Sequence, residues 1–222
     1  NIDSLSGKVL RIDPATGLGM PDNPYFDAAN PGSNRSKVWS YGLRNPFRMA
    51  IEPTSGAPWV GDVGWGAWEE INTGKGANFG WPCYEGAAVT GNASGSTHSR
   101  VQGTYATNTE TAPGCTTLYA EGTAQVTAPR YSYDHSGGGA SANAGTFYSG
   151  AYYPERYQGA LFIADYDRRF IRALTFDESG AVDETINFAT ETGEGSGPVQ
   201  LITGPDTNIY WVKYSSDGGE VR

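Results

Sequence analysis

Short strand-like runs separated by glycine- and proline-rich turns constrain this sequence more than any other feature. Its 222 residues include 31 glycines and 13 prolines, which cost roughly 1 and 3 kcal/mol respectively in a helix interior. No window sustains a 3.6-residue hydrophobic period over three turns. We therefore expect an all-β domain of many short strands, and a helical bundle is excluded.

The strand-like runs recur in a similar order along the chain. We expect strands at residues 8–12, 48–52, 58–63, 68–72, 161–165, 170–176, 199–202, 209–212 and 219–222. The runs 68–72 and 170–176 each follow a strand and a tight turn, and the start of the chain resembles its end. A repeat of roughly 50 residues with several strands is the size of a propeller blade. The alternative is a β-sandwich with similar edge strands.

The number of repeats predicts an incomplete ring. A propeller needs at least four blades to close, whereas this chain holds about three units and the last strands of another. We expect residues 1–222 to form one partial β-propeller domain of about three to four blades, interrupted by a loop insertion at about 83–143. The missing blades would come from the same precursor or from another chain.

The two cysteines, Cys83 and Cys115, lie 32 residues apart in a polar stretch. We expect a disulfide that closes this loop, with free thiols as the alternative. In the chain-entropy model, a loop of this length contributes roughly 3 to 4 kcal/mol of stability. A disulfide would indicate an oxidising compartment, so the expected location is secreted, extracellular or periplasmic.

The charge and the aromatic content argue against two classes of protein. The formal charge of −9, without a basic block, argues against nucleic-acid binding. The 13% aromatic content argues against a disordered chain. No run approaches the roughly 18 apolar residues that a membrane span requires.

Six motifs, taken in order, resemble one family. They are SGKVLRIDP at 6–14, NPY at 23–25, VWSYGLRNPFR at 38–48, GDVGW at 61–65, EEIN at 69–72 and NFGWP at 78–82. They are similar to the soluble sugar dehydrogenases that depend on pyrroloquinoline quinone (PQQ), the glucose/sorbosone dehydrogenase family. The resemblance implies a six-bladed propeller whose later part is this chain. It also implies an oxidoreductase that oxidises an aldose hydroxyl with PQQ as hydride acceptor, with bound Ca²⁺ and a sugar or polysaccharide as partner.

Arg44 and Asn45 match the family's pair of residues that contact the quinone. An arginine stabilises negative charge developing on quinone oxygens, and an asparagine donates from a neutral amide. The alternative is that Arg44 and Asn45 satisfy carbonyl groups of the propeller's own turns.

Four further residues match calcium positions of the family. The backbone carbonyls of Gly64 and Trp65 match ligands of the cofactor's Ca²⁺, although Trp65 replaces a proline. Glu70 and the carbonyl of Phe79 match a second, structural Ca²⁺, and hard oxygen ligands suit this ion. The alternative for Glu69 and Glu70 is a solvated strand edge.

Other positions depart from the family pattern. Asp167 stands where the family places a lysine that pairs with the cofactor, and residues 195–199 contain none of the expected arginines. The family's catalytic histidine belongs to an earlier blade, which leaves His135 as a weak candidate, or as a loop histidine bonded to Asp134. The alternative function is therefore a catalytically degenerate extracellular propeller that acts as a carbohydrate-binding or structural module.

Overall fold

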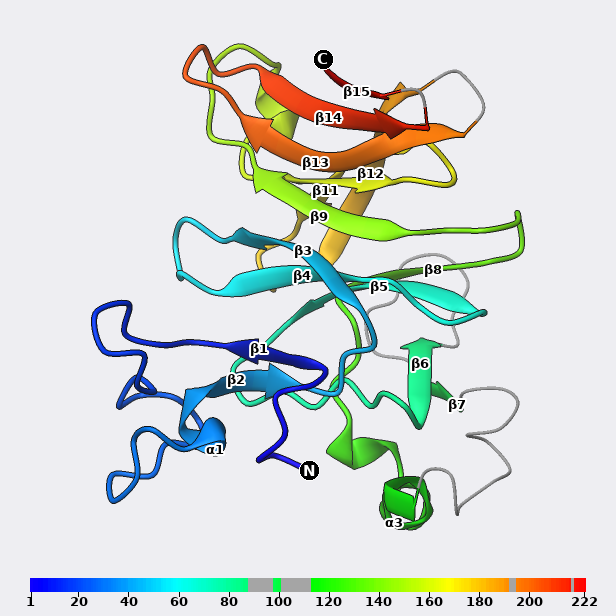
Figure 1. Ribbon diagram of the computed structural model, residues 1–222. Coiled ribbons are helices and arrows are strands. Elements are labelled where there is room, and N and C mark those ends of the chain that lie inside the picture. Colours follow the sequence, from blue (N-terminus) through cyan, green and yellow to red (C-terminus); the bar gives the residue numbers. More distant parts are fainter. Residues whose placement is uncertain (88–97, 101–112, 192–194, 217) are drawn as a thin grey trace.

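The computed structural model describes residues 1–87, 98–100, 113–191, 195–216 and 218–222 (Figure 1). Within these ranges the chain is nearly all β, and its sheets are antiparallel. The sheets lie one above another in Figure 1, with the N-terminus near the bottom of the stack and the C-terminus at the top. None of the described helices is long and apolar enough to cross a membrane.

The first sheet has two strands and the second has four. The first pairs β1 (Lys8–Leu10) with β2 (Val38–Tyr41), which follows the short helix α1 (Asn34–Lys37). The second has the order β3 (Pro46–Ile51), β4 (Pro58–Asp62), β5 (Trp68–Thr73) and β8 (Tyr131–Asp134).

The third and fourth sheets repeat this arrangement. The third has the order β9 (Ala142–Phe147), β10 (Leu161–Asp165), β11 (Phe170–Phe176) and β12 (Val182–Thr190), with the 3₁₀ turn η2 (Glu155–Tyr157) between β9 and β10. The fourth has the order β13 (Ser196–Thr203), β14 (Ile209–Ser215) and β15 (Gly218–Val221). The expected strands 161–165 and 170–176 therefore match β10 and β11.

The sheets meet through their first strands, as the blades of a propeller do. β3 contacts β9, and β9 contacts β13, so these three strands form the inner edge of the stack. The strands β5 and β11, expected to be equivalent, are each third in their sheets. The prediction of a partial β-propeller is confirmed. The β-sandwich alternative is wrong, because the sheets follow one another around their inner strands β3, β9 and β13.

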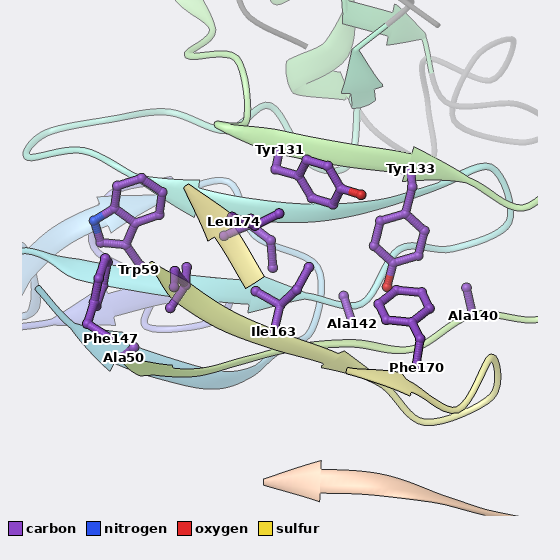
Figure 2. Close-up of a cluster of buried hydrophobic side chains, with 12 residues drawn as sticks. Ala50, Trp59, Tyr131, Tyr133, Ala140, Ala142, Phe147, Ile163, Phe170 and Leu174 are labelled. Atoms are coloured by element: carbon purple, nitrogen blue, oxygen red, sulfur yellow. The ribbon is translucent and has the colours of Figure 1, made fainter. Parts of the chain in front are cut away.

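Aromatic and aliphatic side chains fill the space between successive sheets (Figure 2). Between the second and third sheets, Trp59 lies edge-on against Phe147, with 5.6 Å between ring centroids. Ile71, Ile163 and Leu174 complete this layer and are fully buried. Since burying such a side chain contributes about 1.5–3 kcal/mol, the blades are held together mainly by this packing.

Gly61 on β4 is needed because the backbone of the next sheet comes very close to it. A Cβ atom at Gly61 would lie 2.5 Å from the backbone nitrogen of Ala144 and 2.7 Å from the Cα atom of Asn143. Both contacts are shorter than real Cβ atoms make, and both involve backbone, which shifts only at a cost. The absence of a side chain at Gly61 therefore sets the distance between these two sheets.

Cys83 and Cys115 form the expected disulfide, and both are buried. Cys115 belongs to α3 (Pro113–Glu121), which the 3₁₀ turn η1 (Thr123–Gln125) follows. The described residues of segment 83–143 also include the paired strands β6 (Tyr84–Ala87) and β7 (His98–Arg100), and β8 of the second sheet. Residues 88–97 and 101–112 of this segment lie outside the described part, and its bounds as an insertion stay a prediction.

Candidate functional site

The turns that lead into the inner strands surround a cavity of about 280 Å³. Asn45 precedes β3, and Ser141 precedes β9. Val63 and Tyr166 follow the second strands of the same two sheets. The described residues that line the cavity are Asn45, Phe47, Val63, Ser141, Tyr166, Val199 and Tyr214. The fold thus brings residues from three sheets together at one end of the inner strands.

The turn containing Arg44 and Asn45 is held by the carboxylate of Asp62 at the end of β4. The backbone N–H groups of Arg44 and Asn45 donate to the two oxygens of Asp62, at 3.0 and 2.6 Å. Burial raises the pKa of Asp62 from 3.8 to about 7, and the nearby charge of Glu69 adds to the effect. Asp62 is therefore the residue that shapes this turn.

The side chains of Arg44 and Asn45 border different cavities. The Nη1 atom of Arg44 donates to the carbonyl oxygens of Val63 and Gly64, at 2.9 and 2.8 Å. The guanidinium also lies over the ring of Trp81, 5.7 Å from its centroid. Arg44 lines a cleft of about 530 Å³ beside α3, whereas Asn45 lines the cavity of about 280 Å³. The alternative expected for Arg44, a contact with carbonyl groups of the propeller's own turns, is therefore present in the structure.

Glu69 joins three segments and is fully buried. Its Oε1 atom accepts from the Gly64 N–H at 3.2 Å and lies 2.8 Å from Nε2 of His135. Its Oε2 atom accepts from the Ala142 N–H at 2.7 Å, at the start of β9. Burial raises the pKa of Glu69, while the Ala142 N–H and His135 act in the opposite direction. The sequence alone did not indicate this role of Glu69, and the alternative of a solvated strand edge is wrong for it because Glu69 is buried.

His135 lies just before the inner strand β9, but its side chain bonds to Glu69 rather than to Asp134. Asp134 instead accepts from the backbone N–H of Ser136 at 2.9 Å. The expected hydrogen bond between His135 and Asp134 is therefore wrong, because the partner of His135 is Glu69. No lining residue of the cavity beside Asn45, among those described, is a histidine.

Three buried carboxylates meet beside Gly64. Together with Arg44, the residues Asp62, Glu70 and Glu85 line a cavity of about 10 Å³, which is at the lower limit for one water. Glu70 accepts from the side-chain amide of Asn72 at 2.7 Å and from the Gly86 N–H. Burial raises the pKa of Glu70 from 4.5 to about 8, and the charge of Asp62 contributes. The alternative of a solvated strand edge is wrong for Glu70.

The expected calcium residues are only partly brought together. Gly64 and Glu70 line this small cavity. Trp65 is close by, because its N–H donates to Glu85 and its ring lies edge-on to Trp81. Phe79 is not among the lining residues and is buried in a separate apolar cluster. In the described part of the chain, no three side chains of His, Cys, Asp and Glu are arranged to hold a metal ion.

The cavity beside Asn45 does not fit an acidic quinone. Its described lining contains no cationic side chain. The carboxylate of Asp167 accepts a hydrogen bond from the Ser141 hydroxyl, one of the lining groups, at 2.7 Å. Arg168 next to it donates to the carbonyl oxygen of Asp134 and lies over the ring of Tyr133. The cations that would pair with three carboxylates of PQQ are thus missing from this lining.

The sheets and the turns at their inner ends define a propeller of the sugar dehydrogenase type. The family model "Glucose / Sorbosone dehydrogenase" matches residues 1–123. The chain belongs to this family. It is 40% identical over 83 residues to the aldose sugar dehydrogenase YliI of Escherichia coli, an alignment covering 37% of this chain and 21% of that protein.

Two solved structures give the same fold. The soluble aldose sugar dehydrogenase of Escherichia coli in its apo form is 27% identical, with a TM-score of 0.70, over 100% of this chain and 55% of that one. The PQQ-bound aldose sugar dehydrogenase of Streptomyces coelicolor is 20% identical, with a TM-score of 0.60, over 96% of this chain and 47% of that one. The chain therefore spans about half the length of these proteins.

Proposed function

We propose that the complete protein oxidises aldose sugars and that this chain forms the later blades of its propeller. Oxidation of a sugar hydroxyl removes a hydride from carbon and a proton from oxygen. The observation that carries the proposal is the family membership of residues 1–123, together with the similarity to an aldose sugar dehydrogenase. The turn with Asn45, held by Asp62, supplies an amide at the propeller's inner edge.

The hydride acceptor in this proposal is PQQ. When bound, PQQ supplies an electrophilic quinone carbon, and a protein supplies orientation and electrostatics. The described lining of the cavity beside Asn45 offers no cation to the carboxylates of PQQ. We therefore place the cationic partners of PQQ on polypeptide outside this chain. We place the base that removes the proton from the sugar hydroxyl on the same polypeptide outside this chain.

Calcium is part of the same proposal. Two of the matched positions, Gly64 and Glu70, lie at the same small cavity and support it, because hard oxygen ligands suit Ca²⁺. Burial raises the pKa of Glu70, the charges of Asp62 and Glu85 add to the effect, and a bound cation would offset these charges. Binding of the ion would require these carboxylates to rearrange, since in the described residues each of them is engaged with other groups and they are not arranged to hold a metal ion.

The remaining blades of the propeller are the proposed partner. The apolar side chains of Ile202, Val212, Tyr214 and Val221 are exposed on the sheet of β13 to β15, and packing between blades buries such residues elsewhere in the chain. The Cys83–Cys115 disulfide supports an extracellular or periplasmic location.

The deciding experiment uses the complete protein, purified without cofactor. It is reconstituted with PQQ and Ca²⁺, and reduction of an electron-accepting dye is followed with a panel of aldoses. We expect turnover that requires PQQ. Folded protein that neither binds PQQ nor reduces the dye would reject this function.

A second candidate function is a carbohydrate-binding propeller that has lost the quinone site. The observation in its favour is the uncharged lining beside Asn45 with the Asp167 carboxylate behind it. Binding to immobilised glycans without any dye reduction would support it, whereas PQQ-dependent turnover would reject it.

A further inference from the structure

The turn that follows β4 is held by two carboxylates from the next strands. The Gly64 N–H donates to Oε1 of Glu69 on β5 at 3.2 Å. The Trp65 N–H donates to Glu85 on β6. The turn also packs closely against the start of β5, because a Cβ atom at Gly64 would lie 1.6 Å from the carbonyl oxygen of Trp68. The directions of these peptide groups are therefore fixed by buried acids and by backbone packing.

The carbonyl groups of the same turn bind Arg44. Its Nη1 atom donates to the carbonyl oxygens of Val63 and Gly64, at 2.9 and 2.8 Å. The guanidinium lies over the ring of Trp81, 5.7 Å from the centroid. Because one nitrogen serves both oxygens, the place of the guanidinium over this ring depends on the direction of both carbonyls.

Glu69 and Arg44 bind opposite ends of one peptide group. The peptide between Val63 and Gly64 carries the carbonyl that accepts from Arg44 and the N–H that donates to Glu69. A trans peptide is planar, and its C=O and N–H point in opposite directions. A rotation of this peptide away from Glu69 therefore also turns its carbonyl away from Arg44.

Glu69 is itself held from the turn and strand that begin the third sheet. Its Oε1 atom lies 2.8 Å from Nε2 of His135, and its Oε2 atom accepts from the Ala142 N–H at 2.7 Å. Since the Glu69 carboxylate is fully buried, these protein groups and the Gly64 N–H satisfy it in place of water. Among the described contacts, none joins His135 directly to Arg44, so any link between them runs through Glu69.

We propose that Glu69 is a positioning residue for Arg44. Through the peptide between Val63 and Gly64 it holds the guanidinium over Trp81, and through its own partners it makes this position depend on the third sheet. Arg44 matches a quinone contact of the family, so the importance of its position for turnover rests on the proposed function. The path of contacts from Glu69 to Arg44 does not.

The test follows the Nε–H signal of Arg44 in nitrogen-15 correlation NMR spectra of the complete protein without cofactor. Arg44→Lys assigns the signal, which carries a ring-current shift while the guanidinium lies over the indole. In Glu69→Gln the signal should move towards those of exposed arginines, because the single amide oxygen cannot serve both Gly64 and Ala142. His135→Ala should move it in the same direction. His135→Gln, whose amide can donate to Glu69, should restore it.

Ser136→Ala and Asp177→Ala are the controls. Ser136 lies next to His135, but its hydroxyl donates to Asp134. Asp177 holds a separate turn between β11 and β12, so its loss loosens the third sheet elsewhere. Both variants should leave the arginine signal where it is in the wild type.

An unmoved Arg44 signal in folded Glu69→Gln would overturn the inference. An equal shift in Asp177→Ala would overturn it as well, since general loosening would then explain the change. Because the spectra need neither PQQ nor sugar, a shifted signal in a protein that reduces no dye upholds the inference and counts against the dehydrogenase proposal alone. Dye reduction with an Arg44 signal unmoved in Glu69→Gln has the opposite meaning.

Discussion

Asp62 and Asp165 occupy the same position in two successive blades. Each is the last residue of its sheet's second strand and pairs with the first residue of the inner strand. Each accepts a hydrogen bond from the residue just before that inner strand, Asn45 at 2.6 Å and Ser141 at 2.9 Å. Asn45 and Ser141 both line the cavity of about 280 Å³. One repeated carboxylate thus positions the polar groups of the candidate site.

Removing either carboxylate should destabilise the protein. In Asp62→Ala the part-buried N–H groups of Arg44 and Asn45 lose their acceptor, and in Asp165→Ala the same happens to Ser141. A fully buried unsatisfied donor costs about 1–3 kcal/mol, so for these part-buried donors we expect a loss of about 1 kcal/mol in the free energy of unfolding measured with urea.

The matched control for the two carboxylate variants is Asp183→Ala on the outer strand β12, where the side chain is exposed. It should unfold at nearly the wild-type urea concentration. Equal stability of all three variants would contradict the role assigned to the paired carboxylates.

Stability should fall as the pH rises from about 5 to about 8. Burial raises the pKa of Glu70 from 4.5 to about 8, so the folded state keeps a proton that the unfolded state releases in this range. Since the folded state binds more protons, its stability is present at low pH and is lost as the pH approaches the folded pKa. Asp62, with a pKa raised to about 7, acts in the same direction.

The check is urea unfolding at several pH values between 5 and 8, in the presence of a chelator. Glu70→Gln keeps the shape of the side chain and removes the titration, so its stability should depend less on pH than that of the wild type. Identical pH profiles for the two proteins would rule out this assignment.

Calcium should raise the melting temperature through the carboxylates beside Gly64. A ligand that binds only the folded state at 100 times its Kd stabilises by about 2.7 kcal/mol. We expect a rise on titration with CaCl₂ at pH 8, reversal by a chelator, and a much smaller effect in Glu70→Gln. MgCl₂ serves as the control ion. A rise of the same size in the variant would place the calcium elsewhere.

Gly61→Ala should loosen the contact between the second and third sheets. The added methyl would lie 2.5 Å from the backbone nitrogen of Ala144, and overpacking of this kind costs about 1–3 kcal/mol. Gly66→Ala is the control, because a Cβ atom at Gly66 meets nothing within 4 Å. Thermal unfolding should separate the two variants, and equal melting temperatures would show that the sheets can move apart without cost.

Local sequence signals predicted the strands that begin or end at strong turns. β10 and β11 were predicted to the residue because apolar runs there are bounded by turn residues. β12 was missed, since its exposed outer position leaves it rich in polar residues. β9 was missed because small residues such as Gly145, which packs against Leu201, replace the usual β-branched pattern.

The candidate site was predictable only in part. The motif around residues 44–45 indicated the correct turn, but not that Arg44 and Asn45 face different cavities. The sequence also gave no signal that Glu69 would be buried. Its partner Ala142 is 73 residues away along the chain, and His135 is 66 residues away.

The sequence by itself determined the all-β class and indicated the family, because both depend on residue types at short spacing. The structure decided between a disulfide and free thiols, and between a propeller and a sandwich. The tertiary structure alone decided which acids are buried and which groups meet around the cavity. The physical reason is that burial and pKa depend on what other sheets bring near a side chain. Asp62 becomes a buried carboxylate with a raised pKa, and Asp167 stays an exposed one, only because of where the blades pack.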